Sequence, residues 1–142
     1  MRILIVEDEA IIALCIGMTL REAGHDVMGP VSSLSACAKL AGDTMPDLAL
    51  VDINLESGGS GVDVARMLME RWGVMSIFVS AQEVVARRAR DAAVAHLNKP
   101  FDTKTLLASV DIAETLLQGV MPTRVPFGLE LFVQPGDLRP LH

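Results

Sequence analysis

The chain has 142 residues, of which 51% are hydrophobic and 21% charged, so it can fold as one domain but has no length for a second large one. Its 12 basic and 18 acidic residues leave a formal net charge of -6, and this sign argues against a nucleic-acid backbone or an anionic membrane as the main partner. Cys15 and Cys37 show no metal-ligand spacing, and the apolar run Ile3–Val6 is too short for a signal peptide. We therefore expect a protein of the reducing cytoplasm.

Short apolar runs alternate with helical patterns along the chain, which is typical of a parallel sheet built from strand–helix units. The predicted strands are Arg2–Val6, His25–Val31, Leu48–Asp52, Ile77–Ser80 and His96–Asn98. The predicted helices are Ala10–Ala23, Leu34–Ala41, Gly61–Trp72, Glu83–Val94 and Asp102–Leu117. Ser60 is the expected N-cap of the third helix and Asp102 that of the fifth. Right-handed crossovers place helices on both faces of such a sheet, so we expect an α/β fold with a five-stranded parallel sheet in the flavodoxin-like order 2-1-3-4-5.

Three acidic side chains are expected at one edge of this sheet. Glu7 and Asp8 follow the first strand, and Asp52 ends the third; the crevice beyond these two strand ends is where such folds bind ligands. Carboxylates this close repel one another unless a cation is present, and oxygen ligands suit Mg²⁺. We expect Asp8 and Asp52 as direct ligands, the backbone carbonyl of Asn54 as a further one, and Glu7 acting through water. The alternative is that these acids only complement the dipole of the following helix.

The ends of the two remaining strands add a hydroxyl and an ammonium group. The fourth strand ends in Ser80-Ala81, and the fifth leads into Lys99. Taken singly, the serine is explained as a helix cap and the lysine as a solvated side chain. Together with the carboxylates they supply what phosphoryl transfer needs, namely positioning and neutralisation of phosphate oxygens. A carboxylate nucleophile such as Asp52 would form an aspartyl-phosphate.

Four segments of the chain resemble the response-regulator receiver domains of two-component signalling. They are Ile3–Glu9, Pro46–Leu55, Phe78–Ala81 and Asn98–Phe101, in that order. The resemblance covers about residues 1–118, and we treat these residues as the receiver domain and residues 119–142 as a C-terminal tail.

The resemblance assigns a role to each residue that matches a family motif. It implies that Asp52 is the phosphoacceptor and that Glu7 and Asp8 are the acidic metal pair. It also implies that Ser80 is the switch hydroxyl and that Lys99 is the lysine of the site.

Two further features concern the fifth strand and the loop after the third. The resemblance implies a cis peptide bond between Lys99 and Pro100, because cis bonds are cheap only before proline. His96 stands where the family often has Tyr or Phe; we expect it to take part in the switch and to make it pH-sensitive, because a free imidazole titrates near about 6.5. The loop after Asp52 carries an additional polar run, residues 56–60.

The function implied is that of a stand-alone receiver, since no DNA-binding domain follows in the sequence. It would accept a phosphoryl group from a histidine kinase or phosphotransfer protein with Mg²⁺ as cofactor, and catalyse only its own phosphotransfer and dephosphorylation. Output would pass through protein contacts on the face made by the fourth helix, the fifth strand and the fifth helix. The alternatives are a constitutive pseudo-receiver interaction module and an aspartate-nucleophile phosphatase, which would want a second acid close after Asp52, where Asn54 stands.

The tail has the pattern of a strand. Apolar residues occupy every second position at Val125, Phe127, Leu129, Leu131 and Val133, and such alternation predicts a strand with one buried face. The prolines in the tail limit it to a sheet edge. We expect it to pair with an edge of the sheet, on its own subunit or on a second one to form a dimer; the alternative is a disordered tail.

Overall fold

The computed structural model describes residues 1–55 and 59–138. Part of the polar run 56–60 and the end of the tail, residues 139–142, lie outside the described residues. The strands are β1 (Arg2–Val6), β2 (Asp26–Val31), β3 (Leu48–Val51), β4 (Met75–Ser80), β5 (Ala95–Asn98) and β6 (Leu129–Leu131). The helices are α1 (Ala10–Glu22), α2 (Leu34–Asp43), α3 (Gly61–Trp72), α4 (Glu83–Arg88), α5 (Thr103–Leu117) and the short 3-10 helix η1 (Pro135–Asp137).

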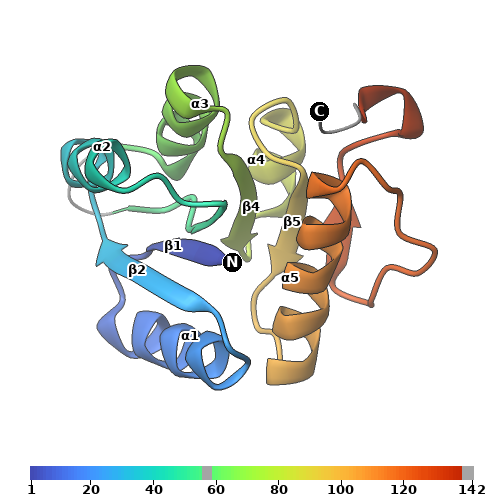
Figure 1. Cartoon of the computed structure of the whole chain (residues 1–142), viewed down its shortest axis with the longest axis horizontal. Coiled ribbons are helices and arrows are strands. Elements are labelled where there is room, and N and C mark those ends of the chain that lie inside the picture. Colours follow the sequence, from blue (N-terminus) through green and yellow to red (C-terminus); the bar gives the residue numbers. More distant parts are fainter. Residues whose placement is uncertain (56–58, 139–142) are drawn as a thin grey trace.

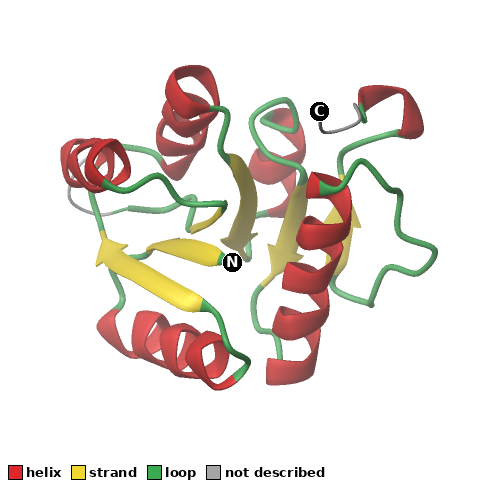
Figure 2. Ribbon diagram, in the orientation of Figure 1, coloured by secondary structure: helices red, strands yellow, loops and turns green. Residues whose placement is uncertain are grey.

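The strands form one sheet in the order β2-β1-β3-β4-β5-β6. Strands β1 to β5 pair with one another in parallel, which confirms the predicted fold class and the order of these five strands. β6, from the tail, pairs antiparallel with β5. The sheet is therefore larger than predicted and mixed, with the sixth strand at its edge (Figure 2).

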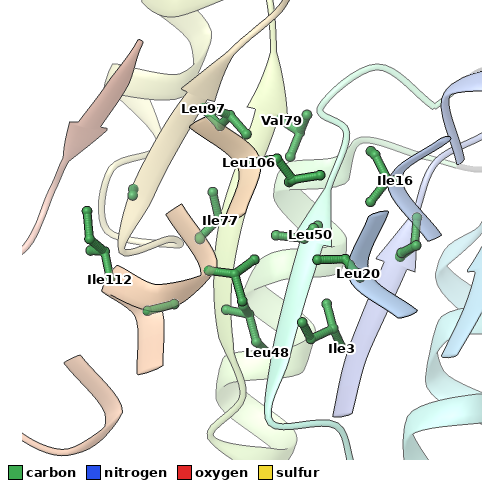
Figure 3. Packing of buried hydrophobic residues seen from close by; sticks show 14 of the residues in the cluster. Ile3, Ile16, Leu20, Leu48, Leu50, Ile77, Val79, Leu97, Leu106 and Ile112 are labelled. Atoms are coloured by element: carbon green, nitrogen blue, oxygen red, sulfur yellow. The ribbon is translucent and has the colours of Figure 1, made fainter. Parts of the chain in front are cut away.

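Helices cover both faces of the sheet and enclose two hydrophobic layers (Figure 1). In one layer, Ile16 and Leu20 of α1 and Leu106 of α5 pack against the sheet (Figure 3). The other layer contains buried residues of α2, α3 and α4. Because successive residues of a strand point to opposite faces, β1 and β3 contribute to both layers. This explains why they read as unbroken apolar runs.

The described helix starts agree with their predicted caps, but α4 is shorter than expected. Ser60 caps α3 by accepting a hydrogen bond from the Val62 N–H at 3.1 Å, and Asp102 caps α5 by accepting one from Thr105 at 2.7 Å. The prediction of a helix as far as Val94 was wrong, because α4 ends at Arg88. The N–H of Val94 donates to the carbonyl of Ser76 in β4. Val94 is therefore hydrogen-bonded to the sheet and not to a helix, although the helical pattern of the sequence extends to it.

The tail joins the edge of its own subunit's sheet. In β6 the residue pairs are Ala95–Leu131, His96–Glu130 and Leu97–Leu129. The predicted strand was longer: Phe127 is fully exposed, and the Leu129 N–H donates to the carbonyl of Pro126 in a turn before the strand. Because this chain buries β6 on its own β5, exchange between two subunits is not needed to cover its apolar side chains.

Among residues 1–55 and 59–138, none of the helices has the length and apolarity required to cross a lipid bilayer.

Candidate functional site

The sheet brings the ends of β1 and β3 side by side. The backbone N–H of Glu7 donates to the carbonyl of Val31 at 2.9 Å, and that of Asp52 donates to the carbonyl of Val6 at 2.9 Å. Both residues thus continue the hydrogen-bonding pattern of the sheet. Their side chains are fixed by the buried strands that precede them.

Glu7, Asp8 and Asp52 form a compact acidic cluster. One carboxylate oxygen of each lies within 4.8 Å of those of the other two. Glu7 is 5% exposed and Asp52 6%, whereas Asp8 is partly exposed. Burial, followed by the hydrogen bond and the negative charge of Asp52, raises the pKa of Glu7 to about 8. Without further positive charge, Glu7 therefore holds a proton at neutral pH.

Lys99 supplies a cation to this cluster from the loop after β5. Its Nζ lies 3.2 Å from Oε1 of Glu7 and 3.4 Å from Oδ2 of Asp52, and its backbone N–H donates to the carbonyl of Ser80. The peptide bond between Lys99 and Pro100 is cis, as is that between Gly29 and Pro30. One ammonium group faces three acidic side chains, so the cluster has the charge and the oxygen donors suited to a divalent cation.

An open pocket of about 320 Å³ lies over these groups. Its lining residues are Asp8, Glu9, Asp52, Asn54, Ser80, Ala81, Gln82 and Lys99. The backbone N–H of Asn54 donates to Oδ1 of Asp52 at 3.1 Å. The fold therefore gathers the residues predicted at four strand ends around the carboxylate of Asp52, with Glu7 buried beside it.

Ser80 and His96 connect the pocket to the interior. The hydroxyl oxygen of Ser80 accepts a hydrogen bond from the N–H of Gln82 at 3.0 Å, just before α4. Nε2 of His96 donates to the carbonyl oxygen of Ser80 at 2.7 Å. His96 is 2% exposed and does not line the pocket, so it contacts the site only through the backbone of Ser80.

Sequence reasoning missed Gly61, the first residue of α3. A Cβ atom at this position would lie 1.9 Å from the carbonyl oxygen of Asp52, and the Gly61 N–H donates to the carbonyl of Ile53 at 2.9 Å. The start of α3 thus packs directly on the backbone that carries Asp52. A glycine directly after the predicted cap Ser60 was the one available signal, and it does not reveal what the residue contacts.

The family model "Response regulator receiver domain" matches residues 3–111, well over half of the chain. Among curated proteins, the chain is 32% identical over 115 residues to the "Transcriptional regulatory protein PdtaR" of Mycobacterium tuberculosis, covering 79% of this chain and 56% of PdtaR. It is 35% identical over 115 residues to the "DNA-binding response regulator MtrA" of Mycobacterium leprae, covering 77% of this chain and 49% of MtrA. The chain thus spans about half the length of these relatives.

Solved structures of receiver domains superimpose closely on this one. The signal receiver domain of a modulated diguanylate cyclase from Desulfovibrio desulfuricans G20 gives a TM-score of 0.72 at 34% identity, covering 79% of this chain and 91% of that domain. The receiver domain of NtrX from Brucella abortus gives a TM-score of 0.73 at 22% identity, covering 78% and 96%, a likeness of fold alone. With the family match over residues 3–111, this chain belongs to the response regulator receiver domain family.

Proposed function

We propose that this receiver domain is a switch controlled by phosphorylation of Asp52. A carboxylate oxygen of Asp52 attacks the phosphorus of a phosphohistidine on a histidine kinase or phosphotransfer protein. The new P–O bond forms as the P–N bond breaks, and the leaving imidazole takes up a proton. The observation that carries the proposal is the position of Asp52, whose carboxylate contacts Lys99 and adjoins two further carboxylates beneath an open pocket.

The residues around Asp52 have separate tasks in this transfer. Lys99 offsets the charge of the carboxylates and of the incoming phosphoryl group, which it can reach from its place in the pocket lining. The N–H of Asn54 orients Asp52 by donating to its Oδ1. The hydroxyl of Ser80 is available as a donor to a phosphoryl oxygen once it turns from its present role as acceptor for Gln82.

The acidic cluster fits a Mg²⁺ ion. Its three carboxylates each place an oxygen within 4.8 Å of the others, and burial, together with Asp52, raises the pKa of Glu7 in spite of the nearby Lys99 ammonium. Asp8 and Asp52 would hold the ion, with the carbonyl of Asn54 as a further ligand and Glu7 acting through water. Bound there, Mg²⁺ would neutralise charge on the transferring phosphoryl group.

The surface beside the pocket suits a protein donor. α1 begins directly after Glu9, which lines the pocket, and it exposes Ile11, Leu14 and Met18. Apolar side chains clustered on a helix next to a reactive crevice favour docking of a partner protein. We propose that the phosphodonor binds here and that the domain acts on itself rather than on a metabolite.

We further propose that this phosphotransfer takes place in the cytoplasm. Cys15 is exposed and Cys37 buried, and both are free thiols, which suits a reducing compartment.

Incubation with acetyl phosphate and Mg²⁺, followed by intact mass measurement, tests this proposal. We expect one phosphoryl group per chain, its loss on treatment with hydroxylamine, and no labelling when a chelator removes the metal. Asp52→Asn should abolish labelling, while the matched change Asp63→Asn, on the first turn of α3, should leave it intact. Equal labelling of Asp52→Asn would exclude Asp52 as acceptor. A parent protein that never takes up phosphate would favour a constitutive interaction module.

A further inference from the structure

The tail segment 128–132, here called the tail strand, is fastened to β5 at both ends. The N–H of Asn98 donates to the carbonyl of Gly128 at 2.8 Å, and the N–H of Phe132 donates to the carbonyl of Val94 at 2.8 Å. Leu129 is buried in the layer beneath α1 and α5. Phe132 is buried in the layer on the opposite face. The tail strand therefore completes the core on both sides of the sheet.

The tail strand is also tied to α4 through exposed polar contacts. Nε and Nη2 of Arg87 lie 2.9 Å and 2.8 Å from Oε2 of Glu130. Arg90, in the turn that follows α4, lies over the ring of Phe132. The guanidinium of Arg87 lowers the pKa of Glu130, so this ion pair is intact at neutral pH. Because the pair is exposed, it stabilises the tail strand only weakly.

A short series of contacts connects Glu130 of the tail strand with Ser80 in the pocket. Glu130 stands opposite His96 in the sheet, and His96 donates to the carbonyl of Ser80. Ser80 in turn accepts the N–H of Gln82 at the start of α4, and α4 carries Arg87. The pocket therefore contacts the residue just before α4, and the tail strand contacts Arg87 near the end of this helix.

A phosphoryl group on Asp52 would disturb this arrangement at Ser80. The N–H that the Ser80 oxygen accepts belongs to Gln82, the residue just before α4. If the Ser80 side chain rotates so that its hydroxyl donates to a phosphoryl oxygen, this contact with Gln82 is lost. The segment that leads into α4 then loses one of its hydrogen bonds, and α4, with only six residues, can shift with it. A shift of α4 moves Arg87 relative to Glu130 and so weakens one of the contacts that hold this three-residue edge strand.

We propose that the tail strand covers the edge of β5 while Asp52 is unphosphorylated and is released by phosphorylation, uncovering that edge for an extended segment of a partner protein. The inference rests on the proposed phosphorylation of Asp52. The partner segment would imitate the strand it replaces, with apolar residues flanking an acidic one that pairs with Arg87. Strand addition of this kind draws affinity from backbone hydrogen bonds and specificity from alternate side chains.

Hydrogen exchange of the full chain, measured with and without acetyl phosphate and Mg²⁺, tests the release. We expect the Phe132 amide to exchange about tenfold faster after phosphorylation, while amides of β1 do not change. Intact mass of the same samples reports whether phosphate is present. If the chain is phosphorylated but exchange in the tail is unchanged, the proposed release of the tail is overturned and the proposed function stands. If the chain takes up no phosphate, both proposals are overturned.

A peptide of residues 125–134, added in trans, tests the uncovered edge. We expect it to bind the phosphorylated chain at least about tenfold more tightly than the unphosphorylated chain, and a peptide with Glu130→Lys to lose this preference. Equal affinity for both states would overturn the inference.

A matched pair of substitutions tests the link to α4. Glu130→Gln should speed tail exchange in the unphosphorylated chain without changing labelling of Asp52. Asp91→Asn removes the other exposed arginine–carboxylate pair, that with Arg66, and should leave the tail unchanged. An effect of equal size from both changes would show that the Arg87 pair has no special part in holding the tail.

Discussion

The acidic crevice and the tail edge both depend on β5, but they are built in opposite ways. In the crevice, Glu7 and Asp52 are nearly buried and follow strands whose last residues are fully buried. The tail strand is held by a few edge hydrogen bonds, two buried side chains and an exposed ion pair. A charged site that must place a reactive carboxylate needs the rigid part of the sheet. A short edge strand can be exchanged at low cost, and this suits a signal output.

The rigidity of the crevice is tested most strongly at Gly61. Gly61→Ala would force a methyl group against the carbonyl of Asp52, so we expect a loss of about 3 kcal/mol in unfolding free energy. Denaturant titration measures it, and phosphorylation of the folded variant should be slowed. Gly42→Ala in α2 is the control, because its Cβ would meet only Trp72, at 3.7 Å. A Gly61 variant as stable as the parent would show that α3 does not brace Asp52.

Removal of the tail measures how much the edge contributes. Truncation after Gln118 uncovers the sites of Leu129 and Phe132. Burial of these two side chains stabilises the folded chain, and the entropy cost of ordering the tail offsets part of that gain. On truncation we therefore expect the unfolding free energy to fall by about 2 kcal/mol and the Tm to be lower. Light scattering should give a monomer mass for both chains. A full-length dimer that becomes a monomer on truncation would instead establish exchange of the tail between subunits.

The charge balance of the crevice sets a pH dependence. Burial and Asp52 raise the pKa of Glu7 from 4.5 to about 8, so between these values the folded metal-free protein binds a proton that the unfolded chain has lost. Unfolding free energy should therefore fall as pH rises through this window, and Mg²⁺ affinity should rise, since the ion displaces the proton.

Glu7→Gln is the variant that isolates this effect. We expect it to flatten the pH dependence of Tm in the metal-free protein and to weaken Mg²⁺ binding, followed by calorimetry from pH 6 to about 8.5. Asp47→Asn is the control, because the Asp47 carboxylate is exposed and accepts a hydrogen bond from the N–H of Arg2 at the other end of β1. An unchanged slope in Glu7→Gln would assign the titration to another group.

The smallest effect is expected at His96, which joins the two regions. His96→Phe removes the hydrogen bond to the Ser80 carbonyl, which keeps its bond from the Lys99 N–H, so the loss should be about 1 kcal/mol. Tail exchange before and after phosphorylation, measured at a single pH, should change less in this variant than in the parent. A change identical to that of the parent would remove His96 from the switch.

Much of the site followed from the order of residues alone. Apolar runs mark the strands, and in a parallel sheet their carboxyl ends share one edge, so Asp52, Ser80 and Lys99 were predicted to meet there. The caps Ser60 and Asp102 were equally local, because a helix start needs an acceptor within three residues. The alternation of apolar residues in the tail is local information as well. Successive side chains of a strand point to opposite faces, so apolar residues at every second position indicate a strand.

Other features depend on contacts between distant parts of the chain, and only the tertiary structure decided them. α4 ends at Arg88 because Val94 is drawn into the sheet, against its helical pattern. The contact of Gly61 with Asp52, the burial of His96 and the raised pKa of Glu7 each require neighbours that the sequence does not place. The pattern of the tail predicted a strand but left its partner open, because many edges satisfy unpaired backbone groups. The fit of Leu129 and Phe132 into the two core layers selected the edge of its own sheet.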